Sequence, residues 1–424
     1  MQWVLTMNKA EILSQGDEVI SGQTVDTNAA WLSAKLILMG FDVIRHTTVG
    51  DDVNALRTVM NEASLRSDLV INTGGLGPTA DDLTAEVVAS LSAQPLVFDE
   101  QAVEMMRIMF KRFGRKMVKA NEKQAWLPAG AQRVDNHWGT APGFSLSLNR
   151  AYMVFLPGVP SEMKKMFEAS VAPRLMTHFD LSPGHLVIFR TSGAGESNLQ
   201  EIIGHYQQPN TILSYRAMGR EVQIKLRFSS ECTEQDIHQR CLAMENKLGV
   251  YLFSVEGWGA SSGGSLGTNV SRLLGERGLS IALAEGSSAG KLNQQFVNTG
   301  CAKAMLKGSI CYHDNLSLAA LLINVSEKHD LISDIGAKQV ALSLRKQFNT
   351  ELSLFTGPLL DVLDEEGVVV AKKSRLVLST PNGLYSREQQ VIGENESCQT
   401  AIMMTSLNFL RLWLMGELDT SLAV

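Results

Sequence analysis

Two acidic residues close a glycine-rich segment in the first third of the chain. Residues 73–82 read TGGLGPTADD, and the short run before them is the apolar DLVIN. Glycines directly after a buried strand let backbone N–H groups approach an anion closely, and the N-terminus of a following helix adds a favourable dipole. The segment therefore predicts a phosphate-binding loop in which Gly74, Gly75 and Gly77 make the contacts.

The paired carboxylates Asp81 and Asp82 make the expected chemistry more specific, because they would repel a bare phosphate. A divalent cation removes this conflict by joining carboxylate oxygens to phosphate oxygens. The eight histidines show no zinc-ligand spacing, so we expect Mg²⁺, Mn²⁺ or Co²⁺ held by carboxylates. The alternative is structural: Asp81 caps the next helix, and the glycines only turn the chain.

A second acidic segment, SQGDEVISGQTVDTN, begins at Ser14 and follows another short apolar run. The first and third strands of a doubly wound sheet are often neighbours, which would bring the two acidic segments together. Carboxylates gathered in this way need a cation or raised pKa values. We therefore expect Asp17 to join the two aspartates as a metal ligand and regard Glu18 as a candidate general base. The alternative leaves both facing solvent, and Asp26 is more simply a helix cap.

A third turn, LPGVPSEMKK, has the pattern of a strand, a glycine turn and a helix with proline in its first turn. Its backbone amides or Ser161 could hold a second phosphate or a ribose. The polar residues of NEKQA are more typical of a surface helix than of a ligand site. The further substrate contacts that we expect are Gly16, Asn28, Thr79, Gly158 and Ser161.

The elements around these segments are expected to alternate between strands and helices. Apolar periodicity predicts strands near 9–13, 41–49 and 68–72, with helices from Thr27 to Gly40 and from Val53 onward. This order is typical of an α/β fold with a largely parallel, doubly wound sheet and helices on both faces. Ligands of such sheets bind beyond the carboxyl ends of the strands, where the glycine segments lie.

The length of 424 residues and the changing order of the expected strands and helices predict three domains. The doubly wound domain occupies 8–174. A small α+β module of strand, helix, strand, helix and strand follows at 175–256. A glycine- and serine-rich linker at 257–265 leads to a third α/β domain at 266–424.

The composition favours a globular protein of the cytoplasm. Apolar residues make up 45% of the chain and charged residues 19%, while a net charge of −6 argues against nucleic acid as a partner. Five scattered cysteines without a CxxC pair suggest reduced thiols. The opening MQWVLTM is too short for a signal peptide, and polar residues interrupt the apolar stretch 401–415. We therefore expect no membrane span, and an amphipathic helix at 401–415.

Six motifs occur in a fixed order between Gly16 and Met163: GDEVISGQTVDTNAAWL, TVGDD, GGLGPTADD, NEKQAWLP, GTAPGF and LPGVPSEM. Together they resemble the competence/damage-inducible CinA family. The resemblance implies an N-terminal domain like molybdopterin-binding proteins, a KH-like middle module, a C-terminal amidohydrolase domain and a homodimer. It also implies a metal-dependent ADP-ribose pyrophosphatase in the first domain and a nicotinamide mononucleotide deamidase in the last.

The C-terminal third departs from the family's pattern at the expected deamidase site. Gly286 stands in AEGSSAG where the family has its nucleophilic serine, and Ser317 replaces the lysine expected five residues after Tyr312. The family's S-G-I-A-G-P stretch is reduced to FTGPLLD. Ser287 or Ser288 could replace the missing serine only if the nucleophile moved along the turn between strand and helix, and even a shift of one residue points the side chain away from the site. A serine without its base is a weak nucleophile, so the resemblance predicts a retained fold without deamidase activity.

The leading hypothesis is hydrolysis of the pyrophosphate of ADP-ribose or a related nucleotide, with Asp81, Asp82 and Asp17 holding the ion. A second is a binding protein that holds a pterin or nucleotide without turnover. A scaffold and a deamidase are the remaining alternatives. Metal dependence separates the first two, because a binder need not require a cation and releases no product.

Overall fold

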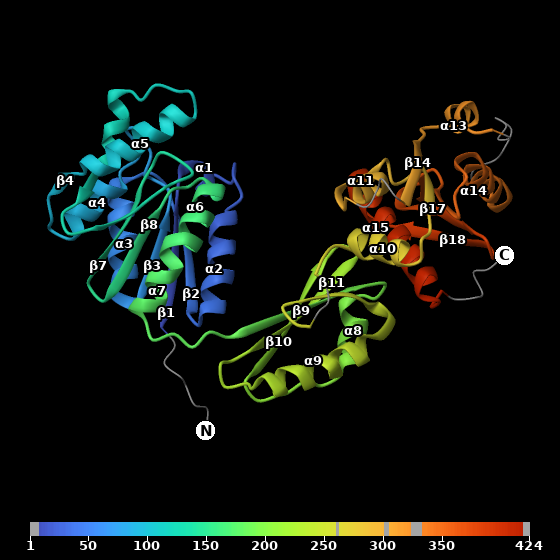
Figure 1. Ribbon diagram of the computed structural model, residues 1–424, viewed down its shortest axis with the longest axis horizontal. Helices are drawn as coiled ribbons and strands as arrows, with labels where there is room; N and C mark the ends of the chain where they lie inside the picture. The colour runs from blue at the N-terminus through green and yellow to red at the C-terminus, as the bar shows by residue number, and fades with distance from the viewer. Residues whose placement is uncertain (1–7, 260–262, 301–304, 324–332, 419–424) are drawn as a thin grey trace. The chain divides into compact units, whose positions relative to one another are not determined.

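The chain divides into two compact units, which we call the N-terminal unit (to His185) and the C-terminal unit (from Leu186). They are drawn from blue to red along the chain in Figure 1. The structure, a computed structural model, describes residues 8–259, 263–300, 305–323 and 333–418. The opening MQWVLTM and part of the expected linker lie outside these residues.

The N-terminal unit is built on a six-stranded sheet with the order β2-β1-β3-β8-β7-β6. Strands β1, β2, β3 and β8 are parallel, whereas β7 and β6 run antiparallel to their neighbours. The strands are β1 (Lys9–Gln15), β2 (Asp42–Val49), β3 (Leu69–Thr73), β6 (Gln132–Val134), β7 (Gly143–Leu148) and β8 (Ala151–Leu156). A separate pair is formed by β4 (Leu96–Phe98) and β5 (Trp126–Pro128). The expected largely parallel sheet is confirmed.

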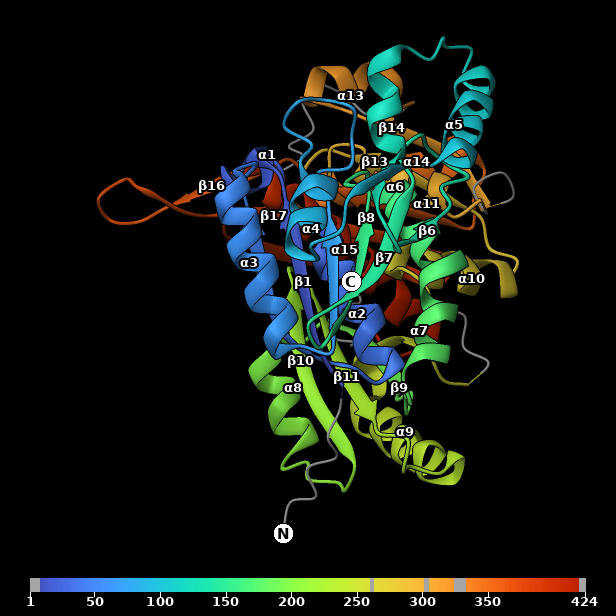
Figure 2. The same ribbon diagram turned by 90° about the vertical axis from the view of Figure 1, so that its left-hand side faces the viewer.

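Helices cover both faces of this sheet, as Figures 1 and 2 show for α2 and α6 on one side and α3 on the other. Successive residues of β1 and β3 therefore point into two different cores: Ile12 and Ile71 into one, Leu13 and Val70 into the other. The helices are α1 (Asp17–Ile20), α2 (Thr27–Met39), α3 (Val53–Arg66), α4 (Thr84–Leu91), α5 (Glu100–Arg112), the 3-10 helix η1 (Lys119–Ala125), α6 (Pro160–Met166), the π-helical turn η2 (Phe167–Val171) and α7 (Ala172–His178).

Local signals in the sequence set the ends of helix α2. The Asp26 side chain accepts a hydrogen bond from the Ala29 N–H, and Gly40 ends the helix in a left-handed conformation with φ 99°. Both predictions for this helix are confirmed, including Asp26 as its cap.

The middle module opens the C-terminal unit with a four-stranded sheet of order β10-β11-β9-β12. It contains β9 (His185–Ser192), α8 (Glu196–Ile203), β10 (Thr211–Met218), β11 (Glu221–Phe228), α9 (Glu234–Leu248), the 3-10 turn η3 (Gly249–Tyr251) and β12 (Leu252–Glu256). We expected one strand between the two helices, which is wrong. The segment folds back at Gly219 and Arg220 into an antiparallel hairpin, because glycine accepts the positive φ of 64° that the tight turn requires.

The last domain holds a sheet of order β14-β13-β15-β17-β16, with β18 paired to β17. Helices α10 and α15 pack on one face and α14 on the other. The elements are α10 (Leu266–Glu276), β13 (Ile281–Glu285), α11 (Lys291–Asn298), β14 (Leu306–Cys311), α13 (Asn315–Leu321), α14 (Asp334–Phe348), β15 (Leu352–Thr356), β16 (Leu360–Leu363), β17 (Val369–Thr380), β18 (Gly383–Val391) and α15 (Asn395–Met415).

Helix α15 differs from the amphipathic helix that we expected. Consecutive residues from Ser406 to Arg411 are all buried, so the helix is enclosed around most of its circumference. Its polar residues Asn408 and Arg411 are therefore inside the fold. Among the described residues, no helix is long and apolar enough to cross a bilayer.

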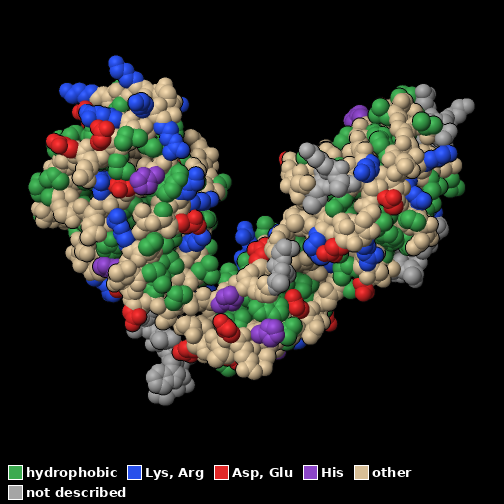
Figure 3. All heavy atoms as spheres, in the orientation of Figure 1, with side chains coloured by type: hydrophobic (Ala, Val, Ile, Leu, Met, Phe, Trp, Pro, Cys, Tyr) green, Lys and Arg blue, Asp and Glu red, His purple; other side chains and the backbone are tan. Residues whose placement is uncertain are grey.

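Figure 3 shows charged side chains of both signs mixed over much of this face, with one group of Lys and Arg side chains near the end of the N-terminal unit where Figure 1 labels α5. The last turn of α5 and the segment after it carry four exposed basic residues, Lys111, Arg112, Arg115 and Lys116.

Candidate functional site

The loops that follow four parallel strands meet at one edge of the N-terminal sheet. Strand β1 pairs with both β2 and β3, and β3 pairs with β8, so their carboxyl ends lie side by side. The loops enclose a hollow of about 420 Å³, which we call the N-terminal hollow. The polar side chains that line it belong to Gln15, Glu18, Asp51, Asp81, Asp82, Gln124, Thr140 and Glu162.

The glycine segment supplies backbone at the floor of this hollow. Gly74 and Gly75 have φ of 104° and 68°, a region that favours glycine. A Cβ at Gly75 would collide with the Gln15 amide and the Thr84 hydroxyl, and one at Gly158 would lie 3.5 Å from the Gly74 Cα. A side chain is therefore excluded at Gly75, whereas the 3.5 Å at Gly158 is an ordinary van der Waals contact between the turns after β3 and β8.

Asp82 holds the glycine segment in its turn. Its Oδ2 accepts hydrogen bonds from the Thr79 N–H at 2.9 Å and from the Thr79 hydroxyl. Helix α4 begins only at Thr84 and has no side-chain cap, so the structural alternative in which Asp81 caps this helix is wrong. Asp81 is exposed at the rim, and hydrogen bonding by Thr79 lowers the pKa of its carboxyl.

Asp17 and Asp51 join the loops after β1 and β2. The Asp51 N–H donates to Asp17 Oδ1 at 3.1 Å, and the Asp17 N–H donates to Asp51 Oδ2 at 3.2 Å. Asp51 lines the hollow, whereas Asp17, which we expected to bind the metal, does not. The sequence pattern placed acidic residues in the right loops but did not single out Asp51.

One buried amide was not expected at the site. Gln124 is buried and donates from Nε2 to the Leu76 carbonyl at 3.1 Å, and its Oε1 has no partner among the described residues. The interpretation of NEKQA as a surface helix is wrong, because η1 packs Asn121 and Gln124 inward. Only the NEKQAWLP motif of the family resemblance pointed to this segment.

The remaining expected contacts lie around the hollow in different ways. Gly16, Gly74, Gly75, Gly77 and Gly158 line it, as do Glu18, Asp81 and Asp82. Asn28 instead donates to the Gly158 carbonyl at 2.8 Å and so fixes the turn after β8. Thr79 is engaged with Asp82, and Ser161 is exposed on α6 away from the lining.

The hollow is strongly acidic. Glu18, Asp51, Asp81, Asp82 and Glu162 contribute carboxylates to it, and Glu162 accepts a hydrogen bond from Asn136 at 2.7 Å. Within the described part of the chain, no three His, Cys, Asp or Glu side chains come together closely enough to hold an ion by themselves. The acidic residues are therefore spread around the rim and floor.

The expected deamidase site in the C-terminal unit has no accessible nucleophile at positions 286, 287 and 288. Gly286 lies beside Tyr312, whose hydroxyl donates to the Thr356 carbonyl at 2.9 Å. Burial raises the pKa of Tyr312 well above its ordinary value. Ser287 and Ser288 are both buried and hydrogen-bonded.

Ser317, which stands where the family has a lysine, makes only local hydrogen bonds in the first turn of a helix. The Ser317 N–H is capped by Asp314 at 2.8 Å, and the Ser317 hydroxyl donates to the Asp314 carbonyl. Asp314 thus caps helix α13, and Ser317, in the first turn of this helix, has no basic group to offer.

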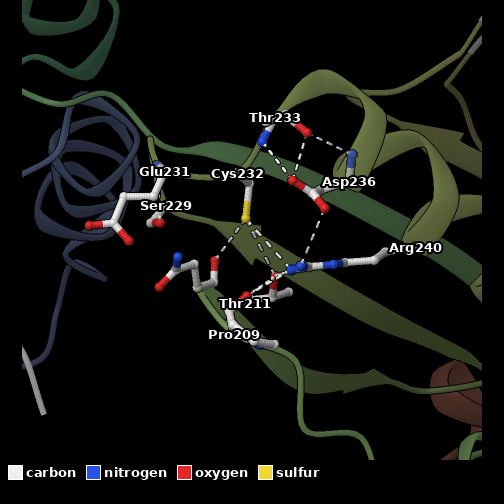
Figure 4. Close-up of polar contacts among 9 residues, drawn as sticks. Pro209, Thr211, Ser229, Glu231, Cys232, Thr233, Asp236 and Arg240 are labelled. Carbon is white, nitrogen blue, oxygen red and sulfur yellow. Dashed lines mark hydrogen bonds and ion pairs between the residues drawn. The ribbon is translucent and has the colours of Figure 1, made fainter. Parts of the chain in front are cut away.

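The cysteines agree with the expectation of reduced thiols. The described ones, Cys232, Cys241, Cys311 and Cys398, are all free, and Cys301 lies outside the described residues. Figure 4 shows Cys232 pointing toward Arg240 and Thr211, with its thiol donating to the Asn210 carbonyl at 3.3 Å. Arg240 also reaches Asp236 at 3.8 Å. The cluster braces α9 against the start of β10.

Relatives of this chain match it over most of its length. A CinA-like protein from Dictyoglomus turgidum is 32% identical over 419 residues, 95% of this chain and 98% of the relative. The chain belongs to the CinA family. A CinA-like protein from Shewanella amazonensis is 33% identical over 389 residues, 89% of each chain.

Two domain families match separate parts of this chain. Residues 11–177 match the family described as "Probable molybdopterin binding domain", and residues 264–412 match the "CinA C-terminal domain". The crystal structure of a CinA protein "with unknown function" from Thermoplasma acidophilum is 34% identical, covering 39% of this chain and 98% of that one, with a TM-score of 0.37. The fold class and family expected from the six motifs are confirmed.

Proposed function

We propose that the N-terminal hollow binds the pyrophosphate of ADP-ribose or a related nucleotide and, with a divalent cation, hydrolyses it to two monophosphates. One observation carries the proposal: glycine backbone at Gly74–Gly77 and the carboxylates of Glu18, Asp51, Asp81 and Asp82 share one hollow of about 420 Å³. That volume falls in the range of small-molecule sites, roughly 300–1,000 Å³. Backbone donors and carboxylates together suit a phosphate that arrives with a cation.

The donor set fits a cation of the Mg²⁺, Mn²⁺ or Co²⁺ type. Such an ion commonly takes one or two carboxylates and completes its shell with water and substrate phosphate oxygens. Asp81 and Asp82 would hold it, with water and phosphate oxygens in its remaining positions, and Asp51, which lines the hollow in the place we had expected for Asp17, would act through a bound water. The ion would neutralise charge that develops on the phosphates.

The chain's own residues have separable tasks in this reaction. The backbone N–H groups of Gly75 and Gly77 bind and orient the pyrophosphate, since the Gly74 N–H already donates to the Leu156 carbonyl at 3.0 Å. The Thr79–Asp82 bonds hold the segment in its turn. Glu18 lines the hollow, and its carboxylate makes no hydrogen bond to the described residues. It can therefore accept a proton from the water whose oxygen bonds to phosphorus as the bridging P–O bond breaks. With ADP-ribose the products are AMP and ribose 5-phosphate.

A second candidate is a binding protein that holds a pterin or nucleotide without turnover. The match of residues 11–177 to a molybdopterin-binding domain supports it. A deamidase is disfavoured by the buried, fully bonded serines beside Gly286.

The test is product analysis on the full chain. Purified protein is incubated with ADP-ribose and either EDTA or one of Mg²⁺, Mn²⁺ and Co²⁺, and AMP and ribose 5-phosphate are quantified. Ammonia release from nicotinamide mononucleotide is followed in parallel. We expect equal amounts of the two monophosphates only with a cation, and no ammonia. Retention of intact nucleotide without AMP under any ion would favour the binding protein, and ammonia would contradict our account of the C-terminal unit.

A further inference from the structure

A second hollow, of about 410 Å³, lies within the C-terminal unit, and we call it the C-terminal hollow. Its wall combines the loop between β9 and α8, the tip of the β10–β11 hairpin, strand β18 and one side of α15. The expected deamidase positions take no part in its lining. The residues that matter here are Ser192, Gly193, Arg220, Arg387 and Asn408.

The loop before α8 presents backbone donors to this hollow. Residues 192–196 read SGAGE, and Gly193 has a φ of 97°. A Cβ at Gly193 would lie 2.9 Å from Asn408 Nδ2, so the absence of a side chain lets the loop approach α15. Helix α8 starts after Gly195 without a side-chain cap, which leaves its first N–H groups available to an anion.

Two almost fully buried side chains face the hollow with unused polar atoms. Asn408 is 9% exposed; its Oδ1 accepts from Arg411 at 3.0 Å, and its Nδ2 donates to no described residue. Ser192 is 2% exposed, and its hydroxyl makes no hydrogen bond to any described residue. Neither atom is among the fully enclosed unpartnered polar atoms of the described residues, so both are accessible from the hollow and can bond to a ligand inside it.

The charge around the hollow is positive. Arg411 is buried behind Asn408 and bonded to the backbone carbonyls of Val250 and Leu252, with no carboxylate within ion-pair distance in the described part of the chain. Arg220 and Arg387 add two exposed guanidinium groups to the lining, and Glu196 is the single acidic residue in it. Burial lowers the pKa of Arg411 to about 10, so it is charged at neutral pH.

We propose that the C-terminal hollow binds the phosphate group of a small phosphorylated metabolite, with donors from the α8 N-terminus, Asn408, Arg220 and Arg387. Donors that converge from several elements suit the tetrahedral oxygens of phosphate. The hollow is much larger than one phosphate, so the ligand carries an organic part. The site lies wholly in the C-terminal unit and does not depend on the pyrophosphatase proposal.

The test uses AMP as the probe, with the full chain in EDTA so that no cation bridges the nucleotide at the N-terminal hollow. Binding is measured by isothermal titration calorimetry, with inorganic phosphate as competitor. Asn408→Asp keeps the acceptor for Arg411 and has nearly the same shape, but it turns the free donor into a carboxylate oxygen. Arg387→Gln removes one exposed charge, and Arg216→Gln on β10 is a matched control outside the lining.

We expect N408D and R387Q each to weaken AMP binding by about tenfold or more, with R216Q unchanged and phosphate competing. Because Arg387 is exposed, R387Q keeps the test valid if N408D does not fold. The proposal is overturned if AMP does not bind in EDTA, or if it binds equally to the wild type and R387Q. Asp82→Asn should leave this binding unchanged, which separates the site from the N-terminal hollow.

Discussion

The side-chain amide of Gln15 donates to Asp51 Oδ1 at 2.9 Å and so joins the ends of the neighbouring strands β1 and β2. Its Oε1 accepts the Thr84 hydroxyl at 2.6 Å, which adds the start of α4 after strand β3. One buried side chain thus connects three of the four loops that build the N-terminal hollow. The sequence does not mark Gln15 as a site residue. Its role arises from the parallel pairing of β1 with β2 and β3, which brings the ends of these strands together.

Replacing Gln15 with methionine should lower the free energy of unfolding by about 1–3 kcal/mol, because Asp51 and Thr84 each lose a partner. Urea denaturation of the full chain, followed by a signal of the N-terminal unit, measures the change. Gln94→Met is the matched control, since Gln94 is exposed. Equal stability of Q15M and Q94M would show that the three loops are held without this side chain.

A buried ion pair should contribute to the stability of the same sheet. Glu11 on β1 is fully buried and accepts from Arg66 at 2.6 and 2.7 Å. Glu11→Gln should lower the free energy of unfolding of the N-terminal unit by roughly 3 kcal/mol. This is the lower end of the range for breaking a buried ion pair, because Arg66 is partly exposed and remains hydrated. Glu62→Gln removes only the exposed partner of Arg66 at 3.4 Å and should change stability little. A similar thermal shift for both variants would contradict this assignment.

Restoring the family serine should not restore deamidation. A Cβ at Gly286 would lie 2.7 Å from the Tyr312 hydroxyl and 2.9 Å from the Gly357 carbonyl, so Gly286→Ser must displace one of them. We expect a loss of stability of about 1–3 kcal/mol and no ammonia from nicotinamide mononucleotide. Ammonia release by G286S would mean that the site had lost only its nucleophile.

The buried thiol of Cys241 should make the C-terminal unit less stable at high pH. Desolvation raises the pKa of Cys241 from 9.0 to about 12, so between these values the unfolded chain has released the proton that the folded chain still holds. Stability therefore falls as pH rises through this window, by up to ~1.4 kcal/mol per pH unit from this group. Denaturation of wild type and Cys241→Ala at pH 8 and 11 measures it. The stability difference between the two proteins should shrink at pH 11, and a constant difference would contradict the prediction.

Most of the fold was predictable from the sequence because local signals agree with it. Asp26 and Gly40 mark both ends of α2, and the buried run at Leu69–Thr73 is too short and apolar for anything but a central strand. The hairpin at Gly219 was missed, because two adjoining strands of eight residues read as one continuous run.

The site was less predictable than the fold. Glycines and carboxylates after strands identified the right loops, but which carboxylate turns inward depends on contacts across loops. Asp17 and Asp51 have the same chemistry and bond to each other's backbone, but only Asp51 also accepts from the Gln15 amide and lines the hollow. Gln124 reaches the hollow from η1 through its bond to the Leu76 carbonyl, a contact between segments 48 residues apart.

The most direct test of the central claim is the kcat/KM for AMP formation from ADP-ribose by wild type and Asp82→Asn, with a divalent cation present. Asp42→Asn is the control, since Asp42 is exposed at the start of β2, the end of that strand opposite the hollow. We predict a loss of about 100-fold or more for D82N, and none for D42N. Equal rates for D82N and wild type, or AMP formation that persists in EDTA, would contradict hydrolysis at the N-terminal hollow.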